Sequence, residues 1–113
     1  MTHVLLIDDD AEQLELRRLV LEQAGMEVRT AECPDAARRM VASGAPSHVV
    51  MDLRLPSVED GLSLIRDLRG EWPQVRIFVL SGFPADLDRL PERRMVDAVM
   101  KKPVPLDGKY EPR

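Results

Sequence analysis

A chain of 113 residues is long enough for one globular domain and too short for two. Its 44% hydrophobic and 32% charged residues are typical of a soluble globule, and its net charge of −4 with scattered basic residues argues against non-specific binding to nucleic acid or to an anionic membrane. The single cysteine, Cys33, excludes an internal disulfide. We find no signal peptide and no apolar run near the roughly 20 residues that cross a bilayer, so we expect a cytoplasmic protein.

The amino-terminal residues predict a buried strand followed by a helix. Residues 4–7 are a short apolar run, and Asp10 after them predicts the cap of a helix that reaches about Ala24. Gly25 predicts the end of this helix. Apolar residues at helical spacing predict the stripe that faces the core: Leu16, Leu19, Val20 and Ala24.

The middle of the chain repeats this alternation. Residues 27–31 alternate apolar and polar side chains, which is typical of a half-exposed edge strand. Pro34 predicts the start of a second helix, and Gly44 follows it. Residues 48–52 are an apolar run that predicts a central strand buried on both faces, ending at Asp52.

The second half continues with a third helix, which we expect to begin after a loop containing Gly61 and to end just before Gly70. Residues 76–80 predict a fourth strand, and residues 97–101 a fifth. Between these strands the pattern is weak, and Pro91 favours a helix that starts near it.

Strands that alternate with helices predict a parallel sheet with right-handed crossovers and helices on both faces. We treat residues 1–113 as one domain. In residues 104–113 the two prolines and Gly108 predict an irregular tail or a truncated last helix.

Polar residues end the predicted strands at one edge of this sheet. Asp8 and Asp9 follow the first strand, Asp52 ends the third, Ser81 follows the fourth, and Lys102 follows the fifth. Crowded carboxylates need a cation, and Mg²⁺ suits carboxylates and phosphate oxygens. A carboxylate beside a metal can attack phosphorus to give an aspartyl phosphate, with a lysine and a hydroxyl to neutralise the phosphoryl oxygens.

These residues resemble the receiver domain of two-component response regulators. The match consists of the Asp8-Asp9 pair, Asp52 in Met-Asp-Leu-Arg-Leu-Pro, Ser81-Gly82 and Lys102-Pro103, and it extends from residue 4 to about 103. The resemblance implies an α/β, flavodoxin-like doubly wound sheet of five parallel strands in the order 2-1-3-4-5.

The resemblance also implies a role for each matching residue. Asp52 is the phosphoacceptor, and its donor is a phosphohistidine on a sensor histidine kinase or a phosphotransfer domain. The Mg²⁺ ligands are Asp8, Asp9, Asp52 and the backbone carbonyl of Arg54. The residues that bind phosphate and respond to it are Ser81, Gly82 and Lys102, with a cis bond at Pro103. Arg54 and Phe83 tune the lifetime of the phosphoryl group. Such a domain is a switch and not an enzyme.

Two departures from the family pattern are informative. The family usually carries an aromatic residue three positions before the lysine, where this chain has Val99. We therefore expect any switch to use the Ser81 loop and the fourth helix. The missing fifth helix predicts apolar surface near the first and fifth strands, which a homodimer partner, an output domain or a continuation of the chain covers.

Three other functions compete with this interpretation. The first is a receiver-like interaction module that acts without phosphorylation, and it fits both departures. The second is a phosphatase with an aspartate nucleophile, which needs a second acid where this chain has Arg54. The third is flavin binding, which is disfavoured because the acids after the first strand repel phosphate.

Overall fold

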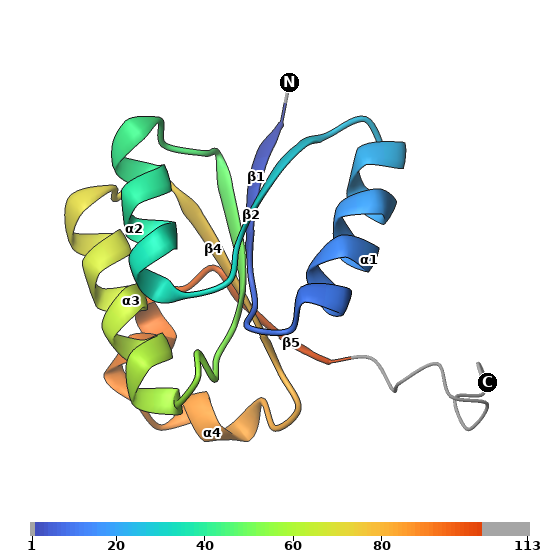
Figure 1. Ribbon diagram of the computed structural model, residues 1–113. Coiled ribbons are helices and arrows are strands. Elements are labelled where there is room, and N and C mark those ends of the chain that lie inside the picture. Colours follow the sequence, from blue (N-terminus) through green and yellow to red (C-terminus); the bar gives the residue numbers. More distant parts are fainter. Residues whose placement is uncertain (1, 103–113) are drawn as a thin grey trace, which may run out of the picture.

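The sheet of the protein is parallel and has five strands. The computed structural model describes residues 2–102. Its strands are β1 (His3–Ile7), β2 (Glu27–Ala31), β3 (His48–Asp52), β4 (Arg76–Ser81) and β5 (Ala98–Lys101). They pair in the order β2-β1-β3-β4-β5, which confirms the predicted topology. All the strands therefore end at one edge (Figure 1).

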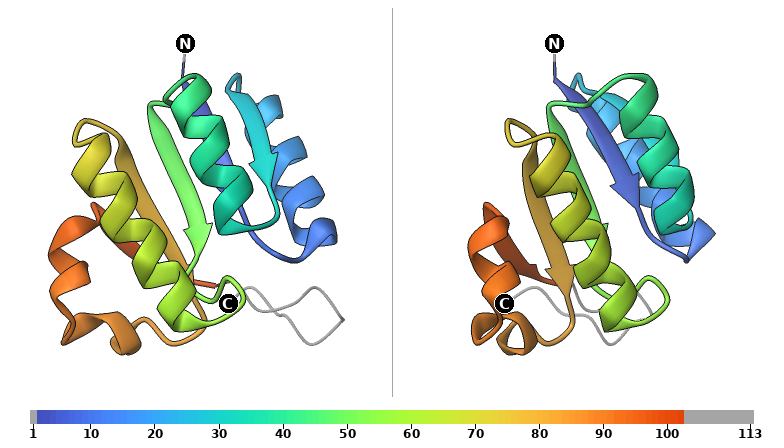
Figure 2. Two further views of the ribbon diagram at one scale, coloured as in Figure 1. Left: turned by 60° about the vertical axis from the view of Figure 1, so that its left-hand side comes forward. Right: turned by 90° about the vertical axis from the view of Figure 1, so that its left-hand side faces the viewer.

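The helices cover the two faces of this sheet unequally. They are α1 (Ala11–Gln23), α2 (Pro34–Ser43), α3 (Val58–Glu71), the short α4 (Ala85–Asp88) and a 3₁₀ helix, η1 (Pro91–Met95). Helices α2 and α3 lie on one face, whereas α1 alone lies on the other within residues 2–102, as Figures 1 and 2 show. The region that predicted a helix near Pro91 thus forms two short helical segments.

The larger hydrophobic core lies between the sheet and helices α2 and α3. Val49 and Met51 of β3 are fully buried there, as is Ile65 of α3. The opposite face holds a smaller cluster of Val4, Leu6 and Leu14 under α1. On that face Val50 is only half-buried, so the prediction that β3 is buried on both faces is wrong for the α1 side.

The predicted core stripe of α1 is also wrong. Leu16, Leu19 and Val20 are 47%, 46% and 60% exposed, and Ala24 is exposed at the helix end. The helix instead turns Leu14 and the half-buried Leu21 towards the sheet. Its contacts with the sheet are chiefly with β1 and β2, and within residues 2–102 no second helix lies beside it on this face (Figure 1).

Most predicted helix ends are confirmed. The Asp10 carboxylate accepts hydrogen bonds from the Glu12 and Gln13 amides and caps α1. Gly25 follows that helix with a φ of 90°, a left-handed conformation that favours glycine. Pro34 occupies the first turn of α2.

Helix α3 is longer than predicted at both ends. Ser57 caps it by accepting a hydrogen bond from the Asp60 amide at 3.2 Å, so the helix begins at Val58 and contains Gly61. It also continues through Gly70 to Glu71. Gly61 is needed because a Cβ at this position would lie 1.8 Å from the Leu53 carbonyl oxygen, whereas a Cβ at Gly70 meets nothing within 4 Å.

A buried carboxylate attaches η1 to α3. Glu92 is 7% exposed and accepts a 2.7 Å hydrogen bond from Arg66 of α3. This contact with the guanidinium holds the pKa of Glu92 below its ordinary value of 4.5. The pair therefore stabilises the packing of η1 against α3.

Some predictions fall outside the described residues. These are the cis bond at Pro103, the irregular tail or truncated helix of residues 104–113, and the absence of a covering fifth helix. Among residues 2–102, no helix has the length and apolar character needed to cross a bilayer.

The close approach of Gly61 to Leu53 predicts that Gly61→Ala destabilises the fold by about 2–4 kcal/mol. The added methyl group would displace the backbone of Leu53, which directly follows Asp52. Gly70→Ala in the same helix should instead be neutral or stabilise by about 0.5–1 kcal/mol. Urea unfolding followed by circular dichroism measures both. Equal stabilities of the two variants would contradict the close approach.

The Glu92–Arg66 pair predicts a pH-dependent contribution to stability. The folded pKa of Glu92 is lowered, so its contribution is present above the unfolded pKa and is lost as pH falls through the folded pKa. Glu92→Gln should cost about 1 kcal/mol at pH 7 and progressively less below pH 4.5. Urea unfolding at several pH values tests this. The exposed Glu71→Gln serves as control and should change stability little at any pH.

Candidate functional site

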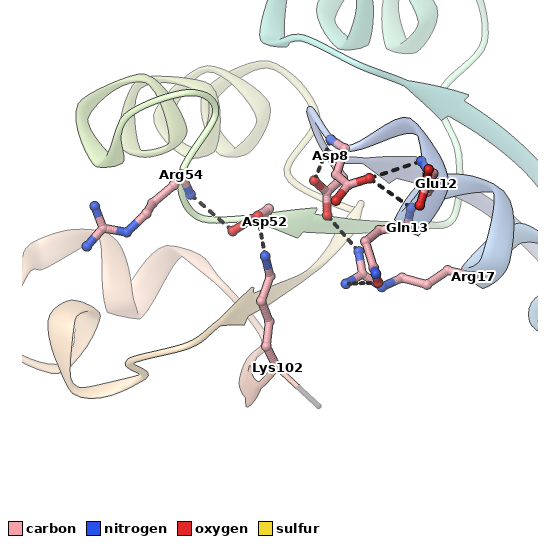
Figure 3. A network of polar contacts seen from close by, with 8 residues as sticks. Asp8, Glu12, Gln13, Arg17, Asp52, Arg54 and Lys102 are labelled. Carbon is pink, nitrogen blue, oxygen red and sulfur yellow. Dashed lines mark hydrogen bonds and ion pairs between the residues drawn. The ribbon is translucent and has the colours of Figure 1, made fainter. Parts of the chain in front are cut away.

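Three carboxylates converge where β1 and β3 end. Asp8 and Asp9 follow β1, and Asp52 is the last residue of β3, which pairs with β1. One carboxylate oxygen from each lies within 4.8 Å of the others. Figure 3 shows Asp8 and Asp52 side by side at this edge. The predicted acidic cluster is therefore present in the fold.

The environment of these acids differs. Asp8 and Asp52 are 1% and 7% exposed, whereas Asp9 is exposed. Desolvation and the neighbouring Asp8 carboxylate raise the pKa of Asp9 above its ordinary value of 3.8. The proximity of Asp8 and Asp52 therefore adds to the effect of desolvation on the pKa of Asp9.

Lys102 supplies a cation to Asp52. Its ammonium Nζ lies 2.6 Å from Asp52 Oδ2, and the Arg54 amide donates to Asp52 Oδ1 at 3.2 Å. The Lys102 amide donates to the Ser81 carbonyl, which places the lysine beside the end of β4. Both oxygens of the predicted phosphoacceptor thus have donors from this chain.

Ser81 lies at the end of β4 and is 6% exposed. Its hydroxyl accepts a 3.0 Å hydrogen bond from the Phe83 amide. Because a hydroxyl both donates and accepts, this bond leaves its proton available to a phosphoryl oxygen. Gly82, between the two residues, is exposed and has no atom within 4 Å of where a Cβ would lie.

The predicted tuning side chains, Arg54 and Phe83, are both exposed. The Arg54 side chain points away from Asp52 (Figure 3) and approaches Asp86 of α4 at 3.7 Å. Phe83 is 68% exposed. Val99, at the position where the family carries an aromatic ring, is half-buried and packs against the larger core.

One residue in the site was not predicted. The Arg17 guanidinium donates to Asp8 Oδ2 at 2.7 Å, while Asp8 Oδ1 accepts from the Asp10 amide at 2.9 Å. The sequence does carry a signal for it. Arg17 stands three residues after Leu14 and four before Leu21, so an arginine interrupts the stripe of α1 that faces the sheet.

The donor set fits a hard divalent cation. Three carboxylates offer oxygen ligands within reach of one another, which suits Mg²⁺ completed by water and phosphate oxygens. Such a triad is typical of the Mg²⁺ site of receiver domains. The cation would also relieve the repulsion that raises the pKa of Asp9.

Comparison with known proteins gives a consistent result. Residues 4–107 match the response regulator receiver domain family. The photosynthetic apparatus regulatory protein RegA of Rhodobacter capsulatus is 37% identical over 82 residues, which cover 73% of this chain and 44% of RegA. The chain therefore spans less than half the length of this curated relative.

Solved structures of receiver proteins share the fold. The Thermotoga maritima response regulator TrrA in complex with Mg²⁺-BeF superposes with a TM-score of 0.83 at 25% identity, covering 96% of this chain and 92% of TrrA. TrrA in complex with the histidine kinase ThkA gives 0.81 at 24% identity, covering 95% and 90%.

The match to the family extends over nearly the whole chain, the strand order agrees, and the acidic triad lies at the expected edge. The chain belongs to the response regulator receiver domain family of two-component signal transduction, whose members are not classed as enzymes.

Proposed function

We propose that this domain accepts a phosphoryl group on Asp52 from a phosphohistidine and thereby changes its affinity for a partner. The observation that carries the proposal is the cluster of charged side chains around Asp52. A nearly buried carboxylate contacts Lys102 and lies within 4.8 Å of oxygens of Asp8 and Asp9. A nucleophile, an anion-neutralising cation and metal ligands are thus assembled at one strand edge.

The reaction needs little from the protein beyond position and charge. An Asp52 oxygen attacks phosphorus, the bond from phosphorus to the histidine nitrogen breaks, and its electron pair stays on the imidazole. Mg²⁺ held by Asp8, Asp9, Asp52 and the Arg54 carbonyl would neutralise phosphoryl oxygens. Lys102, which contacts Asp52 in this structure, pairs with one phosphoryl oxygen, and the Ser81 hydroxyl donates to another.

A structural relative supports a histidine kinase as the donor. TrrA was crystallised in complex with the histidine kinase ThkA, and in another structure with Mg²⁺-BeF. We infer that this chain meets a sensor histidine kinase or a phosphotransfer domain in the same way.

The response to phosphorylation has to travel through the segment that follows β4. Ser81 is linked to Phe83 by the amide-to-hydroxyl bond, and the Phe83 carbonyl accepts from the Asp86 amide in α4. Asp86 also faces Arg54, two residues after Asp52. We propose that α4 is the responding surface. Allosteric coupling of about 1–3 kcal/mol would suffice to change the choice of partner.

The charged cluster around Asp52 predicts that acetyl phosphate adds one phosphoryl group to the protein, and that the addition needs both Mg²⁺ and Asp52. Intact mass spectrometry with and without Mg²⁺ measures the addition. Asp52→Asn should abolish it because an amide cannot act as the nucleophile. Asp88→Asn, an exposed acid in α4, is the matched control and should be modified like the wild type.

Two other outcomes identify the competing functions. If the wild type is not modified and also fails to bind Mg²⁺, the chain is an interaction module that acts without phosphorylation. Steady hydrolysis of a small phosphoester with turnover would instead identify a phosphatase. A modified Asp52→Asn variant would place the phosphoacceptor elsewhere.

A further inference from the structure

The ion pair between Arg17 and Asp8 differs from the other arginine pairs of α1. The Arg17 side chain is 19% exposed and Asp8 1%, with 2.7 Å between guanidinium and carboxylate. By contrast, Arg18 pairs with Glu15 and Glu22 on the helix surface, where those carboxylates are 58% and 39% exposed. Exposed pairs are strongly screened by water, whereas a pair at a buried carboxylate is screened much less. Arg17 therefore contributes a cation to the acidic cluster itself.

Both oxygens of Asp8 are already engaged by the chain. Oδ2 accepts from Arg17, and Oδ1 accepts from the Asp10 amide at 2.9 Å. The second terminal nitrogen of Arg17 lies 3.5 Å from Gln13 Oε1, which helps to orient the guanidinium. A hydrated divalent ion can use Asp8 fully only if Arg17 moves away or shares that oxygen.

The summed charge of the acidic cluster and its cations leads to the same conclusion. Three carboxylates face two cations, Lys102 and Arg17, so that the charges nearly balance before any metal binds. Lys102 belongs to the phosphoryl chemistry. Arg17 has no part in that chemistry, yet its positive charge opposes a second cation beside Asp8.

We propose that Arg17 is a resident counter-ion that competes with Mg²⁺ for Asp8 and so raises the Mg²⁺ concentration at which the domain becomes competent for phosphorylation. The proposal rests on the function proposed above, since it concerns the same carboxylates. Arg17 is here a positioning residue: it acts on the metal site through Asp8 and touches no reacting atom.

A purely structural role predicts something different. If Arg17 only neutralises a buried acid, its removal lowers stability and leaves metal affinity unchanged or weakened, because Asp8 loses its orientation. Competition predicts that metal affinity increases when the positive charge is removed. The two roles are therefore separated by measuring metal binding in the absence of any phosphodonor.

The experiment compares Arg17→Gln with Arg18→Gln, its neighbour in the same helix, which loses the same charge. Isothermal titration with Mg²⁺ alone gives the dissociation constant of each protein. Arg17→Gln should bind Mg²⁺ about tenfold more tightly than the wild type, because a unit charge near the ion has been removed. Arg18→Gln should stay within about twofold of the wild type, and Arg17→Lys should remain closer to the wild type than Arg17→Gln.

Thermal unfolding provides a second readout and covers the case of a poorly stable variant. In EDTA the Tm of Arg17→Gln should fall by roughly 5 °C, because Asp8 loses its partner. Saturating Mg²⁺ should then raise its Tm by more than it raises that of the wild type, since a tighter ligand stabilises more. In the wild type, Mg²⁺ should also shift the side-chain ¹⁵N signals of Arg17 but not those of Arg18.

Equal or weaker Mg²⁺ binding by Arg17→Gln relative to Arg18→Gln would overturn the competition. So would Arg17 signals that Mg²⁺ leaves unchanged in the wild type. These results differ from failure of the proposed function, in which wild-type protein binds no Mg²⁺ and acquires no phosphoryl group on Asp52. If the wild type is phosphorylated normally and Arg17→Gln binds Mg²⁺ with the wild-type affinity, only the proposed role of Arg17 is wrong.

Discussion

Repulsion among three carboxylates at one strand edge is the constraint on which the rest of the structure depends. β1 and β3 are neighbours in the sheet, which brings Asp52 close to Asp8 and Asp9. More than forty residues separate Asp9 from Asp52 in the sequence. The fold can hold them only by delivering cations to the same place. Lys102 arrives from the far end of β5, and Arg17 from α1. The strand order is thus what allows an acid from one half of the chain to meet a lysine from the other.

Much of the fold and most of the site could be predicted, because both follow from local sequence patterns and from the rule that parallel strands end at one edge of the sheet. Apolar runs bounded by glycine, proline and aspartate define the strands, and parallel strands end at a common edge, which brings Asp52 to Lys102. Gly61 and Gly70 show where local reading fails: both lie inside α3, one required by a carbonyl and the other in open space. Sequence spacing cannot distinguish these two environments.

The orientation of α1 could not be predicted for a related reason. Apolar residues occupy two arcs of this helix, one with Leu14 and Leu21 and another with Leu16 and Val20, and hydrophobicity alone does not choose between them. The choice comes from where the helix lies on the sheet, over β1 and β2. The same orientation turns Arg17 inwards, so the error about the apolar stripe and the omission of Arg17 have one physical cause.

In the proposed mechanism, Val99 restricts the route by which a signal can leave the phosphorylation site. A ring at this position could move between buried and exposed states, but a valine packed against the core offers no such movement. The described contacts leave a backbone route instead. The Ser81 hydroxyl accepts a hydrogen bond from the Phe83 amide, and the Phe83 carbonyl accepts one from the Asp86 amide. Arg54, in the loop after β3, approaches the Asp86 carboxylate. Because α4 has only four residues and the Arg54–Asp86 contact is solvent-exposed, rearranging this surface costs little free energy. This supports our proposal that a modest change in the hydrogen bonds of Ser81 alters the face that a partner meets.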